Sequence, residues 1–227
     1  MKIIILTGFT SGLGRALYGQ LKDTVSHNSQ LICIGRHLSR ITLDTSATYI
    51  DMEMSRLQEW KKVTEFINRK ATEITLISNA STIEPIAKVG ALDNSLIQDA
   101  ANINYVNPML LVNELVAYCN NAKVKLNVVN VSSGAASRVI GGWSLYCSTK
   151  AAFRMFLDVM AEDNVSNVKV VHIDPGVINT KMQSTIRSKS SDEMIDVESF
   201  TELKALNKLK SPQDAATELL TKVGITQ

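Results

Sequence analysis

The sequence predicts an α/β fold in which one doubly wound parallel sheet carries helices on both faces. Short, continuous apolar runs alternate along the chain with longer segments of helical character, as in successive βαβ units. A glycine-rich turn follows the first apolar run directly, where such folds bring backbone close to a ligand. The 227 residues suit one α/β domain with a sizeable core, so we expect a single domain over residues 1–227.

The expected strands are apolar runs of the length that a sheet strand needs. Ile3 to Leu6 is continuous and apolar, which is typical of a parallel strand buried on both faces. The strands that the pattern predicts are residues 2–6, 30–34, 48–50, 74–78, 124–131 and 168–173.

The expected helices lie between these strands, at residues 13–25, 56–69, 95–121, 144–163 and 212–222. The third helix is expected to break near Asn107 and Pro108, because proline disfavours helix in the residue before it. The segment 184–191 is rich in Ser, Thr, Arg and Lys, and it is expected to be either a mobile substrate flap or an ordinary exposed loop.

The composition is that of a globular protein, with 45% hydrophobic and 20% charged residues. A net charge of +2, without a basic stripe, gives no reason to expect nucleic acid as a partner. No apolar stretch approaches a membrane span, and the first run is too short for a signal-peptide core. The three cysteines lack metal-ligand spacing, so we expect reduced thiols, no metal and a cytoplasmic protein.

Tyr146 and Lys150 are the most informative pair for function. Residues four apart share one face of a helix, so the ammonium lies where it can favour the phenolate of the tyrosine. Ser133, thirteen residues upstream, offers a hydroxyl that could hold a substrate oxygen. Such a trio suits proton transfer at an oxygen while a hydride moves at the adjacent carbon. The alternative is a half-buried tyrosine beside a solvated lysine.

The glycine turn strengthens the functional interpretation. Gly8, Gly12 and Gly14 separate the first strand from a helix, which lets backbone approach a pyrophosphate at the positive end of that helix. The spacing Gly-x-x-x-Gly-x-Gly differs from the more familiar Gly-x-Gly-x-x-Gly.

These motifs resemble the short-chain dehydrogenase/reductases over nearly the whole chain. The matching segments are 7–14, 78–81, Asn104, Ser133, Tyr146, Lys150 and 175–180, in the order and at the spacing of that family. The resemblance implies a Rossmann-like fold, a nicotinamide cofactor, and a homodimer or homotetramer.

The resemblance also implies a role for each matching residue. Tyr146 would donate the proton, Ser133 would orient the carbonyl oxygen, and Lys150 would lower the tyrosine pKa and bind the nicotinamide ribose. Asn104 would kink its helix and anchor a water that links Lys150 to solvent. Ser132 competes with Ser133 as the catalytic hydroxyl, and the spacing to Tyr146 favours Ser133. The residues implied to bind cofactor are Gly8, Thr10, Ser11, Gly12, Leu13, Gly14, Arg36, Asp51, Met52, Asn79, Ala80, Tyr146, Lys150, Pro175, Gly176, Ile178 and Thr180.

Cofactor choice depends on the end of the second strand. Gly35 stands where enzymes that prefer NAD usually place an acid, and Arg36 follows it, so we expect NADPH in preference to NADH. The alternative is that Arg36 merely stacks on the adenine of NAD. Asp51 is expected beside the adenine, or else as a helix cap.

In the stretch around Asn79, Ser81 replaces the family's glycine.

The substrate is expected to be a small carbonyl compound. Segments 84–86, 180–183 and 203–211 resemble the branch that contains sepiapterin reductase and bacterial benzil reductase, which reduce vicinal dicarbonyl groups. A cation at Lys181 disfavours a basic pterin edge. The residues expected to line an apolar pocket, or else the core, are Val139, Ile140, Trp143, Val177, Met182 and Ile186. The residues expected to contact the substrate are Trp143, Val177, Lys181 and Met182. Two other functions remain open: an NAD-dependent alcohol dehydrogenase, and a catalytically silent nucleotide sensor.

Overall fold

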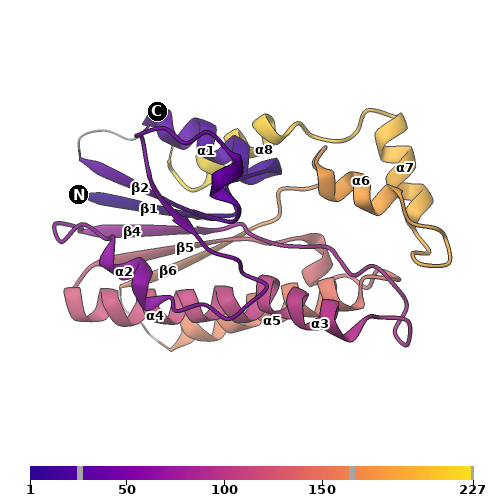
Figure 1. Ribbon diagram of the computed structural model, residues 1–227, viewed down its shortest axis with the longest axis horizontal. Coiled ribbons are helices and arrows are strands. Elements are labelled where there is room, and N and C mark those ends of the chain that lie inside the picture. Colours follow the sequence, from indigo (N-terminus) through magenta and orange to yellow (C-terminus); the bar gives the residue numbers. More distant parts are fainter. Residues whose placement is uncertain (25–27, 164–166, 226–227) are drawn as a thin grey trace.

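A six-stranded, all-parallel sheet forms the centre of the protein, seen here in a computed structural model that describes residues 1–24, 28–163 and 167–225 (Figure 1). The strand order is β3-β2-β1-β4-β5-β6, so the chain starts in the middle of the sheet and winds outward in both directions. The strands are β1 (Lys2–Thr7), β2 (Ser29–Gly35), β3 (Thr48–Asp51), β4 (Glu73–Ser78), β5 (Lys125–Val131) and β6 (Val168–Ile173). All six predicted strands are confirmed to within one residue at each end.

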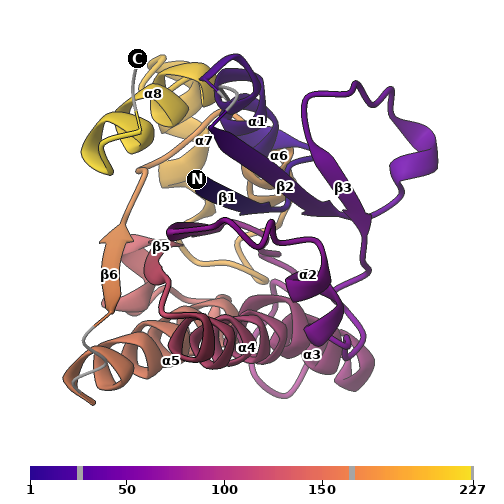
Figure 2. The ribbon, with the colours of Figure 1, turned by 90° about the vertical axis from the view of Figure 1, so that its left-hand side faces the viewer.

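Helices cover both faces of the sheet, as the sequence predicts (Figure 2). On one face, α1 (Gly12–Thr24) and α8 (Pro212–Lys222) pack over side chains such as Leu6 and Cys33. On the other face, α4 (Asn107–Ala122) and α5 (Ser144–Glu162) pack over side chains such as Ile5 and Leu76. The predicted helices 13–25, 144–163 and 212–222 agree with α1, α5 and α8, except that residue 25 lies outside the described residues.

The predicted helix 95–121 is present but irregular. It consists of α3 (Asn94–Ala101), a π-helical turn (Asn102–Val106) and α4, and the irregularity lies just before Pro108 rather than at it. Pro108 has no N–H to donate to the carbonyl four residues earlier, so the hydrogen-bond ladder changes register in the preceding turn. The π turn contains Asn104 and directs it toward the interior.

The predicted helix 56–69 is wrong for most of its length, because only α2 (Lys61–Glu65) is helical. The segment before α2 is held by the fully buried side chain of Asn107. Its Nδ2 donates to the carbonyls of Met54 and Arg56, both at 2.8 Å, and its Oδ1 accepts from Nε1 of Trp60 at 2.9 Å. These contacts pair two backbone carbonyls and the indole N–H. The segment therefore has hydrogen-bond partners without forming a helix.

Two helices follow β6 and cover the carboxyl ends of the strands: α6 (Lys181–Arg187) and α7 (Val197–Ala205) (Figure 1). The expectation of a loop over 184–191 is therefore wrong for its first half, and α7 is not among the predicted helices. The two helices bury a separate apolar cluster, whose members include Ile186, Val197 and the partly buried Phe200. That burial favours helix where the polar sequence alone indicates a loop.

Candidate active site

A cavity of about 590 Å³ opens at the carboxyl ends of the strands, below α6 and α7. This is where open parallel sheets place their ligands. It brings together the glycine turn, the Ser133, Tyr146 and Lys150 side chains, and the segment after β6. Every residue that the sequence assigns to the site lines this cavity except Asp51 and Asn104.

The glycine turn forms a tight cradle that fits a nicotinamide dinucleotide. Gly8 has φ +72° and Gly12 has φ +54°, values that glycine adopts without strain. A Cβ on Gly14 would lie 2.0 Å from the carbonyl oxygen of Gly8, so only glycine allows α1 to start this close to β1. The N-terminus of α1 then opens on the cavity, where its N–H groups suit a pyrophosphate.

Side chains from the segments that follow β4 and β6 close this cradle. Asn79 donates from Nδ2 to the carbonyl of Thr7 at 3.0 Å, and the Thr7 hydroxyl accepts from the backbone N–H of Asn79 at 3.0 Å. Thr180 lies opposite, because its Cγ2 would be 3.4 Å from a Cβ on Gly12. Backbone from three parts of the chain therefore surrounds the space expected for the pyrophosphate and nicotinamide.

At the other end of the cavity, Arg36 is already paired. Its Nη1 lies 3.4 Å from Oε1 of Glu53, and Nε2 of His37 lies 3.9 Å from Oε2 of the same carboxylate. Sequence analysis did not identify Glu53, although it stands two residues after Asp51. The Asp51 carboxylate instead accepts from the backbone N–H of Leu38 at 3.3 Å, at the start of a 3₁₀ turn. Asp51 thus pairs with the first N–H of that turn, whose N-cap residue is His37.

The phenol of Tyr146 is buried beside two serine hydroxyls. Burial raises the pKa of Tyr146 to about 12, and hydrogen bonds with the hydroxyls of Ser133 and Ser81 partly oppose that shift. The sequence indicates the opposite shift, caused by Lys150. That expectation is wrong for the net shift, because burial, which disfavours the charged phenolate, is its largest cause. Tyr146 therefore stays protonated at neutral pH.

Lys150 is buried on the same face of α5 as Tyr146, one helical turn along. Its Nζ lies 5.8 Å from the centre of the Tyr146 ring and donates to the carbonyl of Val131 at 3.0 Å. Burial lowers the pKa of Lys150 to about 8, because an ammonium out of water is disfavoured. The β5 carbonyl fixes the position of the ammonium under the cavity.

Asn104 lies behind the cavity wall and links three segments. Its Oδ1 accepts from the Ser81 hydroxyl at 3.0 Å and from the backbone N–H of Thr82 at 2.8 Å. Its Nδ2 donates to the carbonyl of Thr82 at 2.9 Å and to the hydroxyl of Thr149 at 3.3 Å. Ser81 therefore connects Asn104 to the phenol of Tyr146. The sequence feature that indicates this link is Ser81, which replaces the family's glycine.

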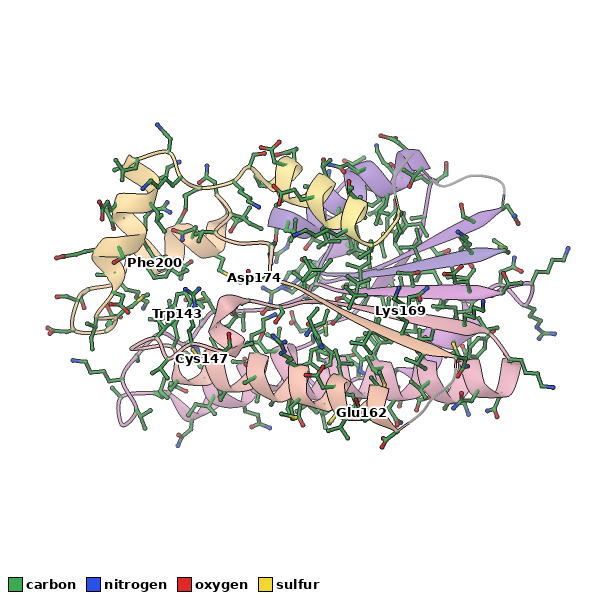
Figure 3. The ribbon with its side chains drawn as sticks, turned by 180° about the vertical axis from the view of Figure 1, so that it is seen from behind. Trp143, Cys147, Glu162, Lys169, Asp174 and Phe200 are labelled. Carbon is green, nitrogen blue, oxygen red and sulfur yellow. The ribbon has the colours of Figure 1, made fainter. Side chains whose placement is uncertain are left out.

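The substrate end of the cavity is aromatic and aliphatic. The Trp143 ring stands edge-on to the Tyr146 ring at 5.6 Å between centroids and packs against Phe200 of α7 at 5.2 Å (Figure 3). Ile140, Met182 and Ile186 also line this end. Val139 does not, because its side chain is fully exposed, so neither the pocket nor the core interpretation holds for it. Phe200 lay in a segment without a recognisable helix pattern, which is why sequence analysis missed it.

The structure describes no helix that is both long enough and apolar enough to cross a bilayer, among residues 1–24, 28–163 and 167–225.

Comparisons with known proteins agree with this arrangement. The family model described as short chain dehydrogenase matches residues 2–191. A benzil reductase ((S)-benzoin forming) of Bacillus subtilis is 32% identical over 97% of this chain and 92% of its own. Sepiapterin reductase of Bos taurus is 28% identical over 96% of this chain and 88% of its own. The crystal structure of the KRED1-Pglu enzyme superposes with a TM-score of 0.81 at 25% identity, over 95% and 92% of the two chains.

The family model covers most of the chain, and the relatives belong to the branch that the sequence resembles. This family uses a nicotinamide dinucleotide, and the glycine cradle, the buried tyrosine and the lysine beneath it line one cavity. The chain therefore belongs to the short-chain dehydrogenase family and is an oxidoreductase that acts on small molecules.

Proposed function

We propose that the protein is an NADPH-dependent carbonyl reductase formed by a single domain, residues 1–227. The observation that carries the proposal is the burial of Tyr146 beside Ser133 and above Lys150, at the wall of one cavity. A protonated phenol with a pKa of about 12 is an acid held ready for an oxygen that becomes strongly basic during reaction.

The chain's own residues handle the oxygen and its proton. Ser133 holds the carbonyl oxygen next to the phenol, and Tyr146 donates its proton as the alkoxide forms. Lys150 stabilises the phenolate that remains, because an ammonium within 6 Å of the ring favours the charged form. The glycine cradle and Thr180 would hold a nicotinamide dinucleotide, which would supply the hydride for the carbonyl carbon. Asn104 and Ser81 keep the phenol in place from behind.

Preference for NADPH is supported by the position of Arg36. The residue lines the cavity end nearest the carboxyl terminus of β2 and exposes 57% of its side chain, so it is accessible to a 2′-phosphate. Glu53 competes for the same guanidinium at 3.4 Å. This carboxylate lines the cavity and favours the alternative, an NAD-dependent alcohol dehydrogenase, because an acid near the ribose suits a 2′-hydroxyl.

A vicinal dicarbonyl compound is the substrate class that we propose. The benzil reductases among the relatives carry a name that refers to this chemistry, because benzil is a vicinal diketone. The aromatic and aliphatic lining around Trp143 and Phe200 favours an apolar compound, as in benzil. Lys181 places a cation at the cavity that disfavours a basic pterin.

We also propose a cytoplasmic homodimer or homotetramer. The outer face of α5 supports association, because Met155 and Val159 are exposed one helical turn apart, at 62% and 52%. Light scattering of the purified protein would measure the mass, and a monomeric mass would remove this part of the proposal.

The test is NADPH consumption by the purified protein with a panel of vicinal diketones and with sepiapterin, repeated with NADH. We expect turnover of diketones with NADPH, slower turnover with NADH, and little turnover of sepiapterin. Faster turnover with NADH would favour the alcohol dehydrogenase. Tight NADPH binding without turnover of any carbonyl compound would favour a nucleotide sensor.

A further inference from the structure

Two buried N–H donors at the substrate end of the cavity have no acceptor. Within the described ranges, Nε1 of Trp143 and Nε2 of Gln183 are buried atoms without a hydrogen-bond partner. Trp143 is 5% exposed and Gln183 is 3% exposed, and both side chains line the cavity. Buried donors are almost always paired in native proteins, so two unpaired donors in one ligand cavity point to a ligand. Sequence analysis did not identify Gln183.

The orientation of the Gln183 amide is fixed by Arg187. Oε1 of Gln183 accepts from Nη1 of Arg187 at 2.6 Å, one helical turn along α6. A guanidinium has donors only, so the amide oxygen must face it and the NH₂ group must point away. The free donor is therefore a consequence of the pairing and does not depend on how the amide is assigned.

The donors are separate from the groups that hold the reacting oxygen. That oxygen is assigned to Ser133 and Tyr146, whereas Trp143 stands beside Tyr146 with its ring edge-on at 5.6 Å. Gln183 belongs to α6, whose neighbouring residue Ile186 packs in the same apolar cluster as Trp143. Both donors therefore belong to side chains that line the cavity beside the groups assigned to the reacting oxygen.

The surroundings select an uncharged oxygen. The cluster beside the donors is apolar, and the Arg187 guanidinium is already occupied by Gln183 and by the Ser184 hydroxyl at 3.5 Å. Lys181 and Arg138 also line the cavity, but both are exposed to solvent. A carboxylate held here would lose hydration without gaining a buried partner charge. A neutral carbonyl oxygen needs only the N–H donors.

We propose that Gln183 is a specificity-determining residue that donates from Nε2 to a second, uncharged carbonyl oxygen of the substrate, with Nε1 of Trp143 as the other donor. The inference rests on the proposed carbonyl reductase and identifies the feature by which a vicinal dicarbonyl is preferred over a simple ketone. Arg187 is a positioning residue, because it acts only through the amide of Gln183.

The test compares two ligands that differ in one oxygen. Binding of 1-phenylpropane-1,2-dione and of propiophenone to the protein saturated with NADP⁺ is measured by titration calorimetry, for the natural chain and for Gln183→Glu and Gln183→Met. The glutamate keeps an acceptor for Arg187 but has no N–H donor, and the methionine keeps the shape alone. We expect both variants to bind the dione about 10- to 100-fold more weakly, while the affinity for propiophenone changes far less.

Ser184→Ala is the matched control, because it removes the other side-chain partner of Arg187 and leaves the Gln183 donor in place. It should keep the preference for the dione. Equal losses for both ligands in the Gln183 variants would show a packing role and overturn the proposal. An unchanged preference would overturn it as well, and so would weakened NADP⁺ binding with an unchanged preference, which would assign the donor to the cofactor.

The two proposals can fail separately, because calorimetry needs no turnover. A natural chain that binds the dione through Gln183 but reduces no carbonyl compound would remove the proposed activity and leave the binding site. A chain that reduces diketones with the same preference in Gln183→Glu would keep the activity and remove this inference.

Discussion

The Nζ atom of Lys150 donates to the backbone carbonyl of Val131 at 3.0 Å, so the last residue of β5 fixes the cation below Tyr146. This contact ties the ammonium to the sheet, and burial makes the ammonium easy to deprotonate. The pKa of Lys150 is lowered to about 8. The consequences appear in both activity and stability.

Carbonyl reduction should slow above about pH 8. Deprotonation of Lys150 removes the charge that stabilises the Tyr146 phenolate, so kcat/KM should be level below that pH and fall about tenfold per pH unit above it. The measurement is kcat/KM for NADPH from pH 6.5 to 9.5, because the pH dependence of kcat/KM reports the pKa values of the free protein. Lys150→Arg should remove the fall, since a guanidinium stays charged throughout. A level profile in the natural chain would contradict this prediction.

The same pKa predicts how stability depends on pH. The folded state holds the Lys150 proton less tightly than the unfolded state, whose pKa is 10.5, so this group lowers the free energy of unfolding below pH 8. This lowering of the free energy of unfolding disappears as the pH rises toward 10.5. Relative to Lys150→Met, the natural chain should therefore gain about 2 kcal/mol between pH 7 and pH 10. Urea unfolding of the two proteins at both pH values measures this gain, and an equal pH dependence of their stability would contradict the prediction.

Tyr146→Phe should abolish turnover and leave NADPH affinity within about twofold, because the phenol acts on substrate while the ring keeps its packing against Trp143. Fluorescence titration with NADPH and a single-turnover assay separate the two effects. Ser81→Ala removes only one of the two hydroxyls at the phenol and should lower kcat about tenfold or less. Substantial residual turnover in Tyr146→Phe would assign the proton donor elsewhere.

Gly14→Ala should weaken NADPH binding by more than tenfold, because its Cβ would meet the Gly8 carbonyl oxygen at 2.0 Å and push α1 away from the turn. Gly19→Ala on the same helix is the matched control, since a Cβ there meets nothing within 4 Å. It should stabilise the protein by about 0.5–1 kcal/mol and leave NADPH affinity unchanged. Equal NADPH affinity in both variants would contradict the prediction that NADPH binding needs the close approach of α1 to the glycine turn.

Asn107→Ala should cost about 2–4 kcal/mol of unfolding free energy without changing cofactor affinity. The side chain is fully buried and pairs with two carbonyls and two N–H groups of the segment before α2, all of which would lose their partner. Asn120→Ala, exposed on the same helix, should cost little. Thermal unfolding measures both variants, and similar melting temperatures would refute the role given to Asn107.

The strands could be predicted because a parallel strand buried on both faces leaves a continuous apolar run, as in Ile3 to Leu6. The segment before α2 could not, because its backbone is paired by Asn107, 47 to 53 positions away along the chain. Likewise α7 depends on contacts such as that of Phe200 with Trp143. Local patterns contain neither kind of long-range contact.

The same distinction holds within the site. The spacing of Tyr146 and Lys150 on a helix indicated their association, which the structure bears out at 5.8 Å. The direction of the Tyr146 pKa shift was wrong, because it follows from burial, and burial is a property of the folded chain. The free donor of Gln183 was missed for the same reason, since its neighbours could be known only after α6 had been placed.

The cluster beneath α6 and α7 shares no residue with the two apolar layers that flank the sheet. A change at Ile186 or Phe200 should therefore affect the substrate end of the cavity more than the strands that carry the glycine turn. Substrate preference and cofactor binding can thus diverge independently in descendants of this chain. Protein engineers could therefore vary α6 and α7 to change substrate preference while keeping the sheet and the glycine turn.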